Sequence, residues 1–163
     1  ALSKEKMKKI NLKLIAKSVV DDFNNIYEAK RGIQIILKDS NDPEDYFING
    51  IENRIEQIIA NLLDNSISFS DNNKKILVEV SKNEREKIIL KVIDEGKGFK
   101  ETSTKKIFDR FYSNRPDNFG EHSGLGLNIV KNLVDLHGAT IYASNNIIKK
   151  GANVEIVFPK AQS

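Results

Sequence analysis

The sequence predicts a single domain of the α/β class, in which one β-sheet carries its helices packed on one face. Its 163 residues suit one domain, and a chain of this length buries about 68–70% of its unfolded surface when it folds. Its hydrophobic residues, 39% of the chain, recur either at every second position or at every third and fourth position. These two periodicities follow one another in the order β-α-β-β-α-β-β-loop-α-β-β, which predicts a two-layer arrangement.

Three segments have the apolar spacing of an amphipathic helix. Glycine ends two of them, and a serine precedes the third in the position of an N-cap. The predicted helices are 13–31, ended by Gly32, then 51–69, and finally 124–137, which is capped by Ser123 and ended by Gly138.

The predicted strands alternate apolar and polar residues, and turn-forming residues separate them. They cover 33–38, 46–49, 76–80, 88–93, 140–144 and 153–158. The polar link 81–87 predicts a hairpin between the third and fourth of these. Residues 95–123 differ from the rest of the chain, because they are polar and weakly periodic. Five of the nine glycines lie between Gly96 and Gly126, and a long loop of this kind is usually functional or disordered.

The composition excludes several classes of protein. The chain has no cysteine and only two histidines, which excludes a disulfide scaffold, cysteine-ligated zinc, a cysteine nucleophile and a multi-histidine metal site. A net charge of +3 with interleaved signs gives no nucleic-acid footprint. Without an apolar run of ~18 residues or a signal-peptide pattern, we expect a soluble intracellular domain. Because it starts at Ala1, we expect it to be part of a longer protein.

An amide stripe on the second predicted helix is the first candidate site. Asn61 and Asn65 are four residues apart, so they share one face, and Gln57 and Ser68 extend it. The stripe is either solvated surface or a source of amide oxygens for a hard cation such as Mg²⁺.

Three further segments have both a structural and a functional interpretation. The run from Asp94 to Phe99 is either a turn at the end of a strand or a place where glycines let the backbone approach a ligand. Gly124-Leu125-Gly126-Leu127 is either a capping turn or a phosphate-binding helix N-terminus. The aromatic run 107–112 is either core packing or part of a hinged lid, with Arg110 or Lys105 available for phosphate.

Taken together, in this order and spacing, the four segments resemble the catalytic ATP-binding domain of bacterial sensor histidine kinases. They are similar to the N, G1, F and G2 boxes of that family, and the resemblance covers residues 10–158. Ser68 and the run Glu121-His122-Ser123 look most like the ChvG/ExoS-type subgroup. The resemblance implies a Bergerat-type ATP-binding fold, an α/β (α+β two-layer) sandwich with a mixed sheet.

The resemblance also implies roles for individual residues. Asn65 would ligate Mg²⁺, and Asn61 would orient water or phosphate beside it, so these two would be the catalytic residues. Asp94 would accept a hydrogen bond from the adenine amine. The other implied nucleotide contacts are Gly96 and Gly98 at the base of the lid, Phe108 and Phe111 as lid anchors, Lys105 and Arg110 near the phosphates, and Ser123, Gly124, Leu125, Gly126 and Leu127 around the phosphate-binding helix start. Residues 99–123 would be mobile without nucleotide and ordered with it.

For the whole protein, the resemblance implies a sensor kinase that uses ATP and Mg²⁺. Residues 1–9 would be the end of a linker helix from a missing dimerisation and phosphoacceptor domain, and residues 10–163 the catalytic domain. The partners would be that domain and a response regulator, with a homodimer as the full-length assembly and no nucleic acid. We expect a cytoplasmic domain of an inner-membrane sensor.

Three departures from the family pattern bear on function. Ser68 stands where many members have lysine, and His122 stands where many have glycine. Neither histidine belongs to a His-Glu or His-Asp phosphoacceptor motif, and we interpret His137 as a helix C-terminal residue favoured by the helix dipole.

Two alternatives remain open from the sequence. One is another ATPase of the same fold, of the gyrase, Hsp90 or anti-sigma-factor kinase type, in which a glutamate at the position of Asn61 typically serves as a base. The other is a non-catalytic module that senses nucleotide or docks a partner.

Overall fold

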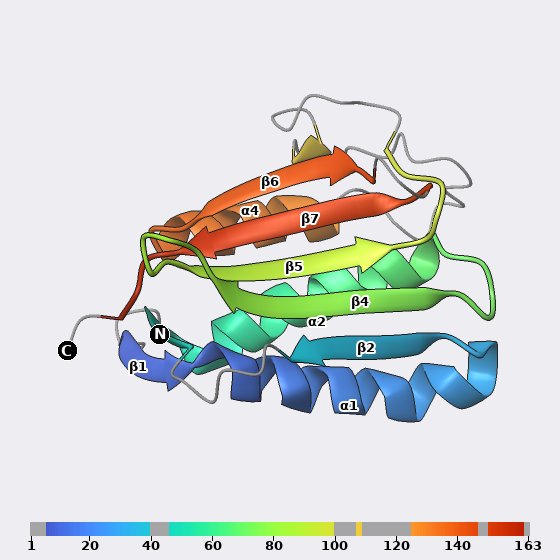
Figure 1. The fold of residues 1–163 in the computed structure, drawn as a ribbon, viewed down its shortest axis with the longest axis horizontal. Coiled ribbons are helices and arrows are strands. Elements are labelled where there is room, and N and C mark those ends of the chain that lie inside the picture. Colours follow the sequence, from blue (N-terminus) through green and yellow to red (C-terminus); the bar gives the residue numbers. More distant parts are fainter. Residues whose placement is uncertain (1–5, 40–45, 100–106, 109–124, 147–149, 162–163) are drawn as a thin grey trace.

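The computed structural model describes residues 6–39, 46–99, 107–108, 125–146 and 150–161 of the chain (Figure 1). The helices and strands lie within two residues of the segments predicted from periodicity, and the structure gives bounds to the first strand of the predicted order, which had none. The elements are β1 (Lys8–Asn11), α1 (Leu12–Arg31), β2 (Gln34–Asp39), β3 (Phe47–Gly50), α2 (Glu52–Ser68), β4 (Lys75–Lys82), β5 (Ile88–Asp94), α4 (Leu125–Leu136), β6 (Thr140–Asn145) and β7 (Ala152–Phe158).

The strands form two sheets, so the prediction of one sheet was wrong. Five strands pair in the order β2-β4-β5-β7-β6, with β2 and β4 parallel and the other pairs antiparallel. This is the mixed sheet that the family resemblance implies. The short strands β1 and β3 instead pair with each other, and the N–H of Leu12 donates to the carbonyl of Tyr46 beside them. Alternation locates a strand, but it does not identify the partner of a four-residue strand.

The first strand also corrects one detail of the N-terminal prediction. Lys8 and Lys9 belong to β1 and pair with β3, so they are not the end of a linker helix. Residues 1–5 lie outside the described part of the chain, and the domain boundary at residue 10 stays a prediction.

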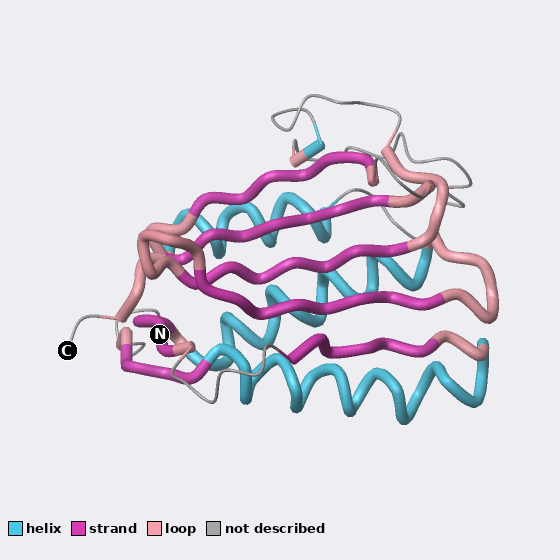
Figure 2. Tube along the Cα trace, in the orientation of Figure 1, coloured by secondary structure: helices cyan, strands magenta, loops and turns pink. Residues whose placement is uncertain are grey.

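The helices α1, α2 and α4, which lie in the described part of the chain, cover one face of the five-stranded sheet (Figures 1 and 2). Strands β5 and β7 alternate strictly between buried and half-buried residues, because one face packs on the helices and the other faces outward. Two ion pairs lie on the outward face, between Lys38 and Glu79 and between Lys91 and Glu155. Because ion pairs occupy the outward face, we expect the functional site on the helix side of the sheet or at the ends of its strands.

The helices differ in how the free backbone N–H and carbonyl groups at their ends are hydrogen-bonded. The Asn11 side chain caps the start of α1, and Gly32, at a φ of 64°, ends that helix as predicted. Helix α2 has neither device: Ile51 gives no side-chain cap at its start, and Phe69 at its end is not in the left-handed conformation. Side chains from α4 and α1 make contacts at its two ends instead.

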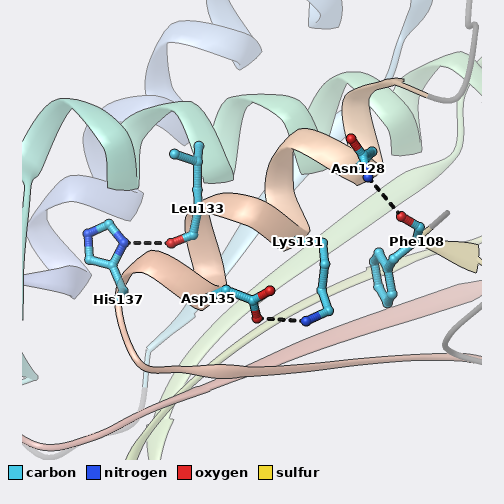
Figure 3. A network of polar contacts seen from close by, with 6 residues as sticks. All are labelled: Phe108, Asn128, Lys131, Leu133, Asp135 and His137. Carbon is cyan, nitrogen blue, oxygen red and sulfur yellow. Dashed lines mark hydrogen bonds and ion pairs between the residues drawn. The ribbon is translucent and has the colours of Figure 1, made fainter. Parts of the chain in front are cut away.

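His137 holds the start of α2 and also contacts Leu133 of α4, a contact that Figure 3 shows. The N–H of Ile51 donates to Nε2 of His137 at 3.1 Å, while Nδ1 lies 2.7 Å from the carbonyl of Leu133. Because Nε2 accepts from Ile51, the hydrogen-bond geometry assigns the ring hydrogen to Nδ1, which faces the Leu133 carbonyl. His137 does follow the end of α4, as predicted, and it contacts the last turn of that helix. The ring thus joins two helices.

Candidate functional site

The predicted site residues gather at one end of the domain. Helix α2 and strand β5 both run toward that end, and α4 starts there, on the right in Figure 1. The end of β6 and the start of β7 lie at the same end of the sheet. This arrangement brings together the last turns of α2, the Asp94 segment and the start of α4, which are far apart in the sequence.

Asp94 is the last residue of β5 and only 1% exposed. Its Oδ1 accepts two backbone hydrogen bonds, from the N–H of Gly96 at 2.9 Å and from the N–H of Ala152 at 3.0 Å. Hydrogen bonds to a charged acceptor are stronger than neutral ones, so the main chain fixes the orientation of this carboxylate. A buried, rigidly held carboxylate is unusual for a simple surface turn.

Contacts within the protein explain why positions 96 and 98 are glycines. A Cβ on Gly96 would lie 2.4 Å from the carbonyl oxygen of Phe69, directly after α2. Gly98 has a φ of 80°, and a Cβ there would lie 2.5 Å from Oδ1 of Asn145. These glycines let the loop rest against the ends of α2 and β6, which fits the interpretation of this segment as a turn at the end of a strand.

Two residues that were not predicted from the sequence, Asn145 and Gly151, hold this loop in place. The Asn145 side chain accepts from the N–H of Phe99 at 2.6 Å and donates to its carbonyl at 3.0 Å. Gly151 packs on the other side, where a Cβ would lie 1.9 Å from the carbonyl oxygen of Asp94. Asparagine and glycine beside a predicted strand do signal a turn, but they do not show which distant segment the turn contacts.

The amide stripe of α2 is only partly exposed. Gln57, Asn61 and Asn65 are half-buried on one side of the helix. Ser68 turns back on its own helix, where its hydroxyl donates to the carbonyl of Asp64 at 2.7 Å. Asn61 and Asn65 are therefore the two amides near the site end of the stripe.

At the start of α4 one glycine is exposed, while neighbouring side chains pack in the core. Gly126 is exposed, and a Cβ on it would meet no atom within 4 Å. Leu127 and Phe108 are 5% and 3% exposed, and Nδ2 of Asn128 donates to the carbonyl of Phe108 at 3.3 Å (Figure 3). Among the described residues nothing gives a packing reason for a glycine at 126, whereas Leu127 and Phe108 belong to the core.

Several predicted residues fall outside the described part of the chain. These are Lys105, Arg110, Phe111, Ser123 and Gly124, together with most of the predicted lid. Within the described residues, no group of three or more His, Cys, Asp or Glu side chains could hold a metal ion. None of the described helices is both long and apolar enough to cross a membrane.

The sequence and the fold match those of a known class of protein. The sequence model of the histidine kinase-, DNA gyrase B-, and HSP90-like ATPases matches residues 50–162. The chain belongs to this family.

Among the relatives within it, the sensor protein ChvG of Agrobacterium fabrum is 31% identical over 94% of this chain and 27% of its own length. The chain thus spans about a quarter of that relative. The catalytic domain of histidine kinase ThkA is similar with a TM-score of 0.79 and 25% identity, over 96% of this chain and 97% of that one. A complex of ThkA with the response regulator TrrA matches with a TM-score of 0.76 over 95% of this chain and 42% of that one, and its 24% identity supports the fold alone. The resemblance to ChvG-type sensor kinases is confirmed.

Proposed function

We propose that this domain binds ATP and donates its γ-phosphoryl group to a histidine on a separate dimerisation and phosphoacceptor domain of a two-component sensor kinase. The observation that carries the proposal is the buried Asp94 carboxylate, which two backbone N–H groups hold at the end of β5. The half-buried amides of α2 and the open start of α4 lie at the same end of the domain.

In the proposed complex Asp94 recognises the base. A carboxylate can accept about four hydrogen bonds, so the two backbone N–H groups at Oδ1 do not exhaust its capacity. An adenine presents an exocyclic amine as a donor, whereas a guanine presents a carbonyl oxygen at the same position. The second arrangement sets acceptor against acceptor, which favours ATP over GTP.

The phosphates are assigned to the start of α4. Backbone N–H groups at a helix N-terminus suit phosphate, and the helix dipole adds to the attraction. Gly124 and Gly126 would supply these N–H groups, with Ser123 and Leu125 beside them and Lys105 and Arg110 as further phosphate contacts. The missing side chain at Gly126 fits this assignment, because a ligand would fill the space that a Cβ leaves open.

Asn65 fits a role as a Mg²⁺ ligand together with the nucleotide. Mg²⁺ prefers oxygen ligands and is usually held by one or two protein groups plus substrate phosphates. When bound, the ion would neutralise charge on the phosphates. Asn61 would orient the reacting groups, and it offers no general base, which disfavours hydrolysis. The histidine nitrogen of the partner would attack the γ-phosphorus while the bond to the bridging oxygen of ADP breaks.

Replacing Asn65 with alanine is expected to weaken binding of Mg-ATP by about tenfold, because the ion loses one protein ligand. ATP binding in the presence of excess EDTA should change by less than about twofold. Calorimetric titration of both variants under both conditions measures this. Equal losses with and without Mg²⁺ would show that Asn65 contacts the nucleotide or the fold rather than the metal.

Replacing Gly126 with alanine is expected to weaken ATP binding without lowering the free energy of unfolding. Alanine is a better helix former by about 1 kcal/mol, and the new methyl group meets open space, so the free energy of unfolding should stay equal or rise. ATP affinity should fall by about tenfold because the methyl group occupies the approach to the N–H groups. Asn132→Ala, an exposed position on the same helix, serves as the control. An unchanged ATP affinity would remove Gly126 from the phosphate site.

The remaining parts of the proposal concern the full-length protein. We infer that it is a homodimer, that its phosphoacceptor domain passes the phosphoryl group to a response regulator, and that this domain lies in the cytoplasm beneath an inner membrane. Membership of the ATPase family and the similarity to sensor kinases support this assignment.

A labelling experiment tests the transfer reaction. The chain alone, incubated with γ-labelled ATP, should gain no stable label, because neither histidine belongs to a His-Glu or His-Asp phosphoacceptor motif and His137 contacts the start of α2, away from the proposed site. Addition of the phosphoacceptor domain as a separate polypeptide should give acid-labile, base-stable label on that polypeptide. The yield should be low, because covalent linkage normally supplies the effective concentration. Stoichiometric label on this chain alone would contradict the donor role.

A further inference from the structure

The C-terminal end of α2 has neither a left-handed cap residue nor a basic side chain of its own. Two backbone hydrogen bonds there are long, at 3.3 Å from the N–H of Phe69 to Asn65 and from the N–H of Ser70 to Ile67. The last carbonyl groups of a helix need other partners, so this end depends on side chains.

Arg31, the last residue of α1, supplies these partners. Its Nη1 donates to the carbonyl of Ile67 at 2.7 Å, its Nη2 donates to that of Ser70 at 2.5 Å, and its Nε donates to Oδ1 of Asn72 at 2.7 Å. In return the N–H of Asn73 donates to the Arg31 carbonyl at 2.9 Å. A basic residue at a helix end commonly serves its own helix. Here the guanidinium caps a different helix.

The segment that Arg31 holds is the one on which the candidate site rests. Asn65 lies in the last turn of α2, and its carbonyl bonds the N–H of Phe69. Gly96 packs so closely on the Phe69 carbonyl that no side chain fits between them. The N–H of Gly96 in turn donates to Oδ1 of Asp94. An unbroken series of contacts thus leads from Arg31 to both Asn65 and Asp94.

We propose that Arg31 is a positioning residue for nucleotide binding, which acts by holding the end of α2 against the Asp94 loop. The proposal rests on the proposed ATP-binding function. Arg31 need not touch the nucleotide, because displacement of a supporting segment is enough to misplace Asn65 and Asp94. Lysine cannot replace the planar fork, which reaches three acceptors at once.

The test compares three variants with the parent chain. Arg31→Ala removes all three donors, and Arg31→Lys retains a positive charge that can reach one acceptor. Asn24→Ala is the matched control, because Asn24 also anchors α1, through paired hydrogen bonds to the backbone of Ile35 in β2 at 2.8 and 2.9 Å rather than to the end of α2. The dissociation constant of Mg-ATP is measured at a temperature where every variant is folded, alongside the unfolding transition of each.

Arg31→Ala should raise the dissociation constant about tenfold, since small misplacements of site groups are costly, and Arg31→Lys should raise it about threefold. Asn24→Ala should lower the unfolding temperature yet leave the constant within about twofold of the parent. If Arg31→Ala changes the constant no more than Asn24→Ala does, the proposal is overturned. Arg31→Lys decides by the same comparison if Arg31→Ala does not fold.

A measurement without nucleotide separates this proposal from the proposed function. Hydrogen exchange of the Gly96 amide reports whether its bond to Asp94 stays closed. It should be about tenfold faster in Arg31→Ala than in Asn24→Ala. Equal exchange in the two variants overturns the positioning role even if ATP binds. Failure of the parent chain to bind ATP would instead remove the proposed function, while faster exchange would still support the structural link from Arg31 to Gly96.

Discussion

Replacing Asp94 with asparagine should weaken ATP binding by about tenfold to 150-fold while the domain stays folded. The amide oxygen of asparagine can still accept from the N–H groups of Gly96 and Ala152, so the local fold is retained. The amide NH₂ group, however, is a donor that would face the donor amine of adenine. Hydrogen bonds to charged groups contribute about 1.5–3 kcal/mol, which sets the expected loss. Calorimetric titration with ATP measures it.

Two comparisons make this result specific to the base. Asp94→Ala leaves both buried N–H groups without their acceptor, so it should also lower the free energy of unfolding by about 2–4 kcal/mol. GTP should compete poorly with ATP for the parent chain, and the Asp94→Asn variant should discriminate less between the two. If Asp94→Asn binds ATP as tightly as the parent does, Asp94 is only a structural residue of the turn.

Replacing Gly151 with alanine should lower the free energy of unfolding by about 4 kcal/mol or more, which is exceptional for a single methyl group. The new Cβ would lie 1.9 Å from the carbonyl oxygen of Asp94, and the nearest atoms all belong to the backbone. Neither side can relax by a simple side-chain rotation, because the N–H of the next residue, Ala152, is bonded to the Asp94 carboxylate. Denaturant unfolding monitored by circular dichroism gives the value.

Gly138→Ala is the matched control for this collision. Gly138 has a φ of 65°, but a Cβ there would meet no atom within 4 Å. Its replacement carries only the cost of the left-handed backbone, about 1–2 kcal/mol. A loss at Gly151 no greater than that at Gly138 would mean that the β7 start can move away from Asp94, and the close packing would then not fix the carboxylate.

The sequence predicted those parts of the site that lie in local patterns. Helical spacing predicted that Asn61 and Asn65 share one face of α2. The apolar run before Asp94 predicted that this residue lies at the end of a strand. Both depend on neighbours within a few residues, so periodicity reveals them.

The residues that hold the site in place were not predictable in this way. Asn145, Gly151 and Arg31 each contact a segment that is 36–57 residues away along the chain. An asparagine, a glycine or an arginine near the end of an element has many possible partners, and spacing does not choose among them. The same limit explains the separate sheet of β1 and β3. These strands are not consecutive in the chain, and their pairing joins the segments that directly precede α1 and α2.

The fastening of Asp94 to Ala152 has a consequence for the order in which the protein matures during synthesis. The two residues are 58 positions apart, and β7 is the last of the described strands in chain order. Contacts of such high sequence separation form only after most of the domain has become available. A nascent chain that ends before β7 would carry every amide of the α2 stripe but lack one of the two N–H groups that orient the carboxylate. On the proposed role of Asp94, full discrimination between bases would therefore require the final strand of this domain.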